Sequence, residues 1–193
     1  MCRYILHQDD KIFKSETILN YFQLFGIEQS FDVDLSQLST TYQNLQKAVH
    51  PDKFAHASNQ EQLLAVQKSA EINDAYQILK QPLKRAEYLL TLRSVDIPNE
   101  QQSFKDTHFL IAQMELREML DEVKFSDDVE AALEQAQQTL TEQYQTLLTL
   151  MQQQINENTT AANNSACDNL RKLKFYQKLN VEVERLEDSL FDD

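Results

Sequence analysis

The scarcity of turn-forming residues is the feature that most constrains the fold of this chain. Only one glycine and three prolines occur among its 193 residues. These two residue types interrupt helices and form most tight turns, so few places remain where the chain can reverse direction. No stretch alternates strictly between apolar and polar residues, as a half-buried strand would. The sequence therefore predicts an all-α fold.

Apolar spacing predicts four helices in the N-terminal half. A short aromatic helix begins at Tyr21 and ends at Gly26, since glycine readily adopts the positive φ of a helix C-cap. Longer helices are predicted at 34–50, 59–80 and 82–93. The predicted contact faces of the first two long helices consist of Leu35, Leu38, Tyr42, Leu45 and Val49, and of Leu63, Val66, Ala70, Ile72, Ala75, Tyr76 and Leu79.

The C-terminal half is predicted to form a three-helix bundle. Its helices are expected at about 104–123, 127–157 and 166–191, with a polar loop at 156–164. The middle helix carries one continuous apolar stripe, formed by Val129, Leu133, Ala136, Leu140, Tyr144, Leu147, Met151 and Ile155. An oligomeric coiled coil is an alternative explanation of this stripe, but packing within the same chain explains it without a partner.

Acidic side chains are concentrated in the C-terminal half. Residues 95–193 contain 20 Asp and Glu against 8 Lys and Arg, and the formal net charge of the whole chain is −13. Nucleic acids and anionic membranes both attract basic surfaces, so neither is a predicted partner. The sequence also has no run of 18 apolar residues that would predict a membrane span.

The residues that could carry chemistry do not form a recognisable catalytic or metal site. Cys2 and Cys167 lie far apart and outside any CxxC pattern, so neither a disulfide framework nor a structural zinc site is predicted. An enzymatic interpretation would combine His50, Asp52 and His56, but no fourth ligand or nucleophile accompanies them. We therefore predict no catalytic residue, no metal and no cofactor.

The helix at 106–122 has apolar residues on two opposite sides. The ordinary core side consists of Phe109, Ala112, Leu116, Met119 and Leu120. The other side consists of Leu110, Ile111 and Met114, bordered by Glu115, Glu118 and Glu122. This second side is either a binding surface or is covered by another part of the chain, and the pattern alone does not decide. On another helix, Phe175 begins a stripe that continues through Leu179 and Val183, so its spacing favours a core position.

Several motifs resemble one family of co-chaperones. Two helices joined by an exposed turn with His50, Pro51, Asp52 and Lys53 resemble the centre of a J-domain. Further matches lie at 21–26, 72–76, 82–90, 109–110, 115–122 and 171–175. Together they resemble the HscB-type J-proteins of iron–sulfur cluster assembly over about residues 20–193.

The resemblance implies a division of the chain into functional parts. An N-terminal extension at 1–17 would precede a J-domain at 18–94, built as a helical hairpin with short flanking helices. A linker at 95–103 would lead to a three-helix scaffold-binding domain at 104–193. The protein itself would be a monomer without enzymatic activity.

The resemblance also assigns residues to two partners. An HscA-like heat-shock ATPase would be bound, and its ATP hydrolysis stimulated, through His50, Pro51, Asp52, Lys53 and Lys47. An IscU-like scaffold would be bound through Leu110, Ile111, Met114, Glu115, Glu118, Glu122 and Phe175, which moves Phe175 from the predicted core to the surface. A J-domain co-chaperone with a different client is the main alternative.

The chain departs from the family pattern near the first of these surfaces. Thr41 stands where relatives often have a basic residue, so electrostatic attraction to an acidic chaperone surface is expected to be weaker. Neither a mitochondrial transit peptide nor a cysteine-rich N-terminal metal module is recognisable in the sequence. We therefore expect a bacterial cytoplasmic protein.

Overall fold

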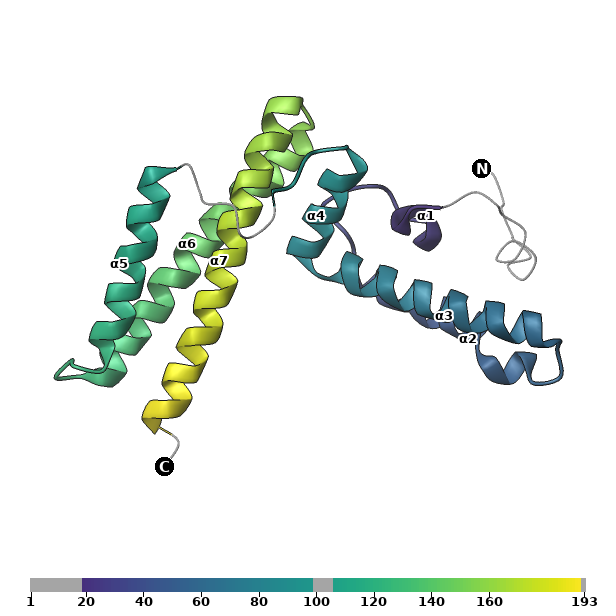
Figure 1. Cartoon of the computed structure of the whole chain (residues 1–193), viewed down its shortest axis with the longest axis horizontal. Coiled ribbons are helices and arrows are strands. Elements are labelled where there is room, and N and C mark those ends of the chain that lie inside the picture. The colour runs from purple at the N-terminus through teal and green to yellow at the C-terminus, as the bar shows by residue number, and fades with distance from the viewer. Residues whose placement is uncertain (1–18, 99–105, 192–193) are drawn as a thin grey trace. The chain divides into compact units, whose positions relative to one another are not determined.

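The computed structural model describes residues 19–98 and 106–191, and within these residues all regular secondary structure is helical (Figure 1). This confirms the predicted all-α fold. The chain divides after Arg85 into two compact units, residues 1–85 and 86–193. The predicted extension at 1–17 and most of the predicted linker at 95–103 lie outside the described residues. Among the helices that are described, none is both long and apolar enough to cross a membrane.

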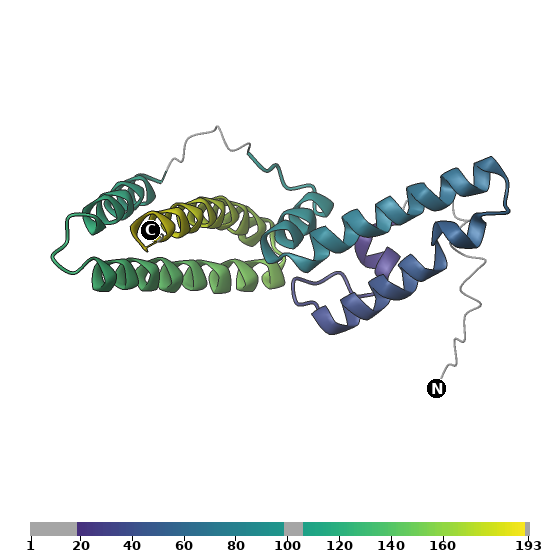
Figure 2. The same ribbon diagram turned by 90° about the horizontal axis from the view of Figure 1, so that it is seen from below.

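The first unit is organised around a helical hairpin. Helices α2 (Leu35–Ala48) and α3 (Asn59–Lys80) run side by side and are joined through the short 3₁₀ helix η2 (Pro51–Phe54), as Figures 1 and 2 show. The short helix α1 (Tyr21–Phe25) packs against both helices of the hairpin. Helix α4 (Pro82–Leu92) begins in this unit and continues into the second.

The helix ends in this unit follow from capping residues that the sequence displays. Asp34 accepts hydrogen bonds from the backbone N–H groups of Ser36 and Gln37 at the start of α2. Gly26 ends α1 with a φ of 64°, as predicted, a conformation that favours glycine because it has no Cβ. Pro82 occupies the first turn of α4, where its missing N–H costs no helical hydrogen bond.

The predicted contact face of α3 is partly wrong. Leu63 and Val66 are 59% and 54% exposed, whereas Ala65 is fully buried. The buried side of α3 consists of Ala65, Ile72, Ala75 and Leu79. The size of an apolar side chain does not decide which side of the helix is buried: the fully buried Ala65 lets the helix pack closely, and Leu63 and Val66 then point outward. Leu35, predicted to lie on the contact face of α2, is likewise 53% exposed.

The second unit contains the predicted three-helix bundle of α5 (Thr107–Val123), α6 (Val129–Glu157) and α7 (Thr160–Phe191). Helices α6 and α7 lie antiparallel along most of their length, and α5 lies beside them (Figure 2). The apolar stripe of α6 faces this core, with Leu133, Ala136, Leu140, Met151 and Ile155 buried and Val129, Tyr144 and Leu147 partly buried. Phe109, Leu116 and Leu120 contribute the predicted core side of α5.

The predicted polar loop at 156–164 is wrong, because α7 begins at Thr160. Only Asn158 and Thr159 separate α6 from α7, and Asn158 caps α6 in the left-handed region, with a φ of 53°. The hydroxyl of Thr159 then accepts a hydrogen bond from the N–H of Ala162. Asn163 is buried and its side-chain oxygen accepts a 2.8 Å hydrogen bond from Arg93, which also donates to the carbonyl of Ile155. A tertiary contact therefore stabilises a helix start that polar composition alone does not predict.

Two leucines on α3 allow a matched test of the packing. We expect Leu79→Ala to lower the free energy of unfolding by roughly 2–5 kcal/mol, because it leaves a cavity at a fully buried site. Leu63→Ala removes the same atoms from an exposed site and should change this free energy by less than about 0.5 kcal/mol. Urea titration followed by circular dichroism measures both, and equal losses would mean that Leu63 belongs to the core.

Candidate binding surfaces

The turn between α2 and α3 is held by its own hydrogen bonds. His50 has a φ of −59° and a ψ of 132°, an extended conformation that the following Pro51 favours. Its Nδ1 accepts a 3.3 Å hydrogen bond from the N–H of Asp52, and its carbonyl accepts one of 3.0 Å from the N–H of Lys53. The side chains of His50 and Asp52 are 59% and 91% exposed. These two hydrogen bonds fix the turn, and most of both side chains stays exposed to a partner.

Two lysines border this turn. Lys47 lies in the last turn of α2, and Lys53 follows Asp52 in η2. Both are exposed. On the second hairpin helix, Gln62 donates hydrogen bonds to the carbonyls of Ala55 and Ala57, which ties the segment after η2 to α3. The five predicted chaperone-binding residues thus occupy one end of the hairpin.

The second apolar side of α5 is open to solvent within its own unit. Ile111 is 49% and Met114 63% exposed, and Leu110 is half-buried. The predicted acidic border, formed by Glu115, Glu118 and Glu122, is exposed as well. By contrast, Leu116 and Leu120 on the core side are 5% and 7% exposed. One helix therefore presents a packed face and an unpacked apolar face with an acidic border.

The burial of Phe175 is intermediate between the core position that its spacing predicts and the surface position that the family resemblance implies. Its ring is half-buried and meets those of Phe109 and Tyr176 edge-on, with centroid distances of 5.6 and 5.7 Å. The Arg117 guanidinium carbon lies 5.7 Å from the same ring centroid. The expectation that Phe175 is a plain surface residue is therefore wrong, because one part of its ring packs on the bundle core and another remains exposed.

Two exposed residues, one on α5 and one in the turn after it, are not among the predicted site residues. Arg117 follows Met114 by three positions on α5, so helical spacing places them on one side, whereas the predicted site contains only apolar and acidic residues there. Phe125, just after α5, is 86% exposed. No periodic pattern includes it, because it belongs to the turn between α5 and α6.

An ion pair fixes the start of α5 to α7. The carboxylate of Asp106 caps α5 by accepting from the N–H of Phe109, and it lies 2.6 Å from the Nζ of Lys172. Lys172 also lies over the ring of Phe109, 5.2 Å from its centroid. The hydrogen bond from Lys172, helped by the one from the Phe109 backbone, lowers the pKa of Asp106 below its ordinary value.

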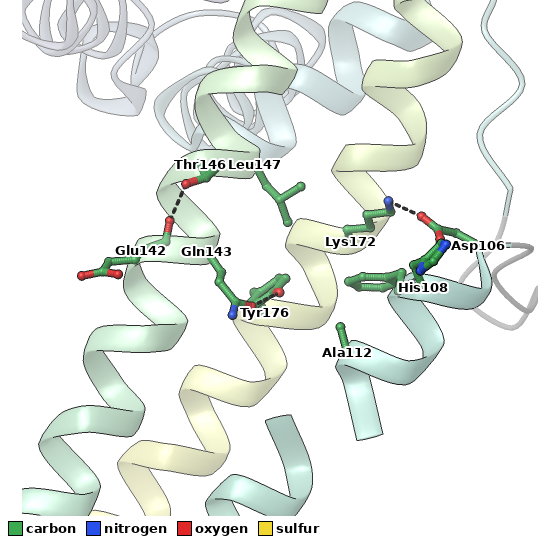
Figure 3. A pocket seen from close by; sticks show the side chains of 10 residues that line it. Asp106, His108, Ala112, Glu142, Gln143, Thr146, Leu147, Lys172 and Tyr176 are labelled. Atoms are coloured by element: carbon green, nitrogen blue, oxygen red, sulfur yellow. Dashed lines mark hydrogen bonds and ion pairs between the residues drawn. The ribbon is translucent and has the colours of Figure 1, made fainter. Parts of the chain in front are cut away.

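Figure 3 shows an open cleft between α5, α6 and α7, with a volume of about 490 Å³. Asp106, His108 and Ala112 line one side, and Glu142, Gln143, Thr146 and Leu147 line another. At its base the hydroxyl of Tyr176 donates a 2.6 Å hydrogen bond to Gln143. Burial raises the pKa of Tyr176. None of the predicted scaffold-binding residues lines this cleft.

The described residues contain no group of three or more His, Cys, Asp and Glu side chains arranged to hold a metal ion. Cys167 is buried and free, while Cys2 lies outside the described part of the chain. Burial is the main cause of the raised pKa of the Cys167 thiol. A thiol with a raised pKa is less reactive, because less of it is present as thiolate.

Comparison with known proteins identifies the family. A DnaJ domain matches residues 20–88, and a domain described as the HSCB C-terminal oligomerisation domain matches residues 105–184. The Co-chaperone protein HscB homolog of Colwellia psychrerythraea is 69% identical over 175 residues, which cover 91% of this chain and all of that relative. The chain is a member of the HscB family of co-chaperones.

Solved structures of HscB proteins support the assignment. The chaperone HscB from Vibrio cholerae has a TM-score of 0.85 and 48% identity, over 89% of this chain and all of that one. The human co-chaperone protein HscB has a TM-score of 0.80 and 28% identity, over 90% of this chain and 84% of that one. The predicted resemblance to HscB-type J-proteins is confirmed, as is the presence of a J-domain.

The ion pair of Asp106 predicts that the stability of the fold depends on pH. A lowered pKa in the folded state means that the carboxylate stabilises the fold above about pH 3.8 and that this contribution is lost as the pH falls through the folded pKa. Asp106→Asn keeps a capping oxygen but removes the charge. We expect the variant to be less stable than wild type at pH 7 and the difference to shrink below pH 3.8 in urea titrations. A difference that stays constant across this range would contradict the proposed cause.

Proposed function

We propose that this HscB-family co-chaperone serves iron–sulfur cluster biogenesis in the bacterial cytoplasm. Its J-domain binds an HscA-like heat-shock ATPase and stimulates ATP hydrolysis, while its C-terminal bundle binds an IscU-like scaffold and delivers it to that ATPase. The observation that carries this proposal is the presence of two separate exposed surfaces, one on each unit. These are the turn at His50–Pro51–Asp52 and the apolar side of α5.

The exposed charged side chains of the turn suit binding to a partner protein and not catalysis by this chain. Asp52 is almost fully exposed, and its carboxylate lies 3.5 Å from the Nδ1 of His50. The two side chains therefore form one exposed pair, in which the carboxylate can accept a hydrogen bond from a partner or pair with a cation. Lys47 and Lys53 add positive charge at the same end of the hairpin, which speeds association with an acidic surface. In this proposal the turn binds the ATPase, and ATP hydrolysis takes place on the ATPase.

The surface of α5 has the composition of a protein-binding site. Ile111 and Met114 provide an apolar centre, and three glutamates form an acidic border. In such interfaces the buried apolar residues contribute most of the affinity, whereas border charges chiefly affect the association rate. A scaffold with an apolar patch surrounded by basic residues would complement this surface.

A second copy of the chain is the alternative occupant of the α5 surface. The family domain that matches residues 105–184 is described as an oligomerisation domain, which favours this alternative. We propose a monomer instead. Sedimentation of the free chain tests this, and self-association that Met114→Lys abolishes would favour the alternative.

A single charge on the turn tests the chaperone interaction. We expect Asp52→Asn to reduce stimulation of the purified HscA-like ATPase to the level of the ATPase alone, with an unchanged circular dichroism spectrum, because an exposed side chain contributes to recognition and not to packing. Asp74→Asn is the matched control, since Asp74 is an exposed acid on α3 of the same unit. If Asp52→Asn stimulates as well as the control, the turn is not the chaperone contact.

Two exposed apolar residues test the scaffold interaction. We expect the double variant Ile111→Ala and Met114→Ala to lose on the order of 2 kcal/mol or more of affinity for the purified IscU-like scaffold, measured by calorimetry. Its melting temperature should barely change. Leu116→Ala, on the core side of the same helix, should instead lower the free energy of unfolding by roughly 2–5 kcal/mol. A double variant that unfolds as readily as Leu116→Ala would place the second side of α5 in a core.

A further inference from the structure

Arg117 lies where the two helices of the proposed scaffold surface meet. It belongs to α5, is exposed, and places its guanidinium carbon 5.7 Å from the ring centroid of Phe175 on α7. On a helix, residues separated by three, four or seven positions share one side, so Arg117 shares a side with Leu110 and Met114. It therefore connects the apolar residues of α5 to the exposed part of Phe175.

The guanidinium of Arg117 lacks an acidic partner among the described residues. Two lysines of the same unit form ion pairs, Lys172 with Asp106 at 2.6 Å and Lys174 with Glu87 at 2.8 Å. No carboxylate of the described chain lies within ion-pair distance of Arg117, although Glu118 is its neighbour in sequence. Arg117 is thus an unpaired cation on a surface whose other charged residues are mainly acidic.

The cation–π contact with Phe175 leaves hydrogen-bond donors of Arg117 available. An aromatic ring attracts a guanidinium group without occupying its N–H groups, and the planar arrangement of these groups matches the two oxygens of a carboxylate. Burial of the surface by a partner would exclude water and strengthen both the cation–π contact and a charged hydrogen bond.

We propose that Arg117 is a partner-binding residue that receives a carboxylate side chain of the scaffold. This inference rests on the proposed scaffold-binding function and adds a chemical requirement to it. The scaffold must present an acidic residue beside its apolar patch, in addition to the basic residues that would face the glutamates of α5. One cation within an acidic border would thereby determine the orientation in which the two proteins bind.

Calorimetric titration of the full chain with the purified scaffold tests this inference. We expect Arg117→Gln to weaken the affinity about tenfold or more and Arg117→Lys to give an intermediate value, because lysine keeps the charge but loses the planar pair of donors. Arg185→Gln is the matched control, since Arg185 is exposed farther along α7. We expect this control variant to bind the scaffold as tightly as wild type. Thermal melting of each variant checks that the fold is retained.

A second series of titrations identifies the carboxylate. Each exposed Asp or Glu of the scaffold is changed to Asn or Gln, and we expect one such change to weaken binding to the wild-type chain but not to Arg117→Gln. If Arg117→Gln weakens binding but no scaffold residue behaves in this way, Arg117 only positions Phe175 and the inference is wrong.

The remaining outcomes separate this inference from the proposed function. If Arg117→Gln binds as tightly as wild type, or more tightly, while the double variant of Ile111 and Met114 loses affinity, the inference is wrong and the proposed function stands. If the wild-type chain does not bind the scaffold, both are wrong.

Discussion

The antiparallel contact between α6 and α7 is the interaction on which the C-terminal unit depends. Leu140, Met151 and Ile155 of α6 and Leu170, Leu173 and Leu179 of α7 are completely buried. Burying each such side chain away from water stabilises the folded state by roughly 1.5–3 kcal/mol. Because these two helices supply most of the core, α5 needs only one packed side to complete it. The opposite side of α5 then stays exposed, as Ile111 and Met114 are.

The outer side of α5 depends on how the helix is held as well as on which residues it carries. The ion pair between Asp106 and Lys172 holds the first turn of α5 against α7, and the ring of Phe109 packs beneath Phe175. These contacts fix α5 so that residues of two helices form one surface. A preorganised surface loses less conformational entropy on binding than one that must first be assembled.

The J-domain turn follows the same principle on a smaller scale. The hairpin behind it is joined by the stacked rings of Tyr42 and Tyr76, at 4.2 Å, and by hydrogen bonds between Gln46 and Ser69. The turn itself is fixed by hydrogen bonds from the N–H groups of Asp52 and Lys53 to the Nδ1 and the carbonyl of His50, so His50 and Asp52 can be exposed without making the segment disordered. Rigid elements thus present exposed residues in both units.

Much of this arrangement could be predicted from the sequence, because it depends on local patterns. Capping at Asp34 and Gly26, and the apolar stripe of α6, require only residue type and spacing. The exposure of Leu63 was not predictable in this way, since the closeness of packing at Ala65 decides it. The helical start of α7 at Thr160 depends on contacts of Asn163 with Arg93, far away in sequence. The half-burial of Phe175 and its cation–π contact with Arg117 likewise depend on where a second helix lies.

We propose above all that the two units bind separate partners, one through the turn at His50–Asp52 and the other through the outer side of α5. Nuclear magnetic resonance of the ¹⁵N-labelled chain, titrated with the unlabelled scaffold, tests this directly. We expect the largest shifts of backbone resonances along the outer side of α5 and around Phe175, and none around the turn at His50–Asp52. Large shifts around that turn, with α5 unaffected, would contradict the account.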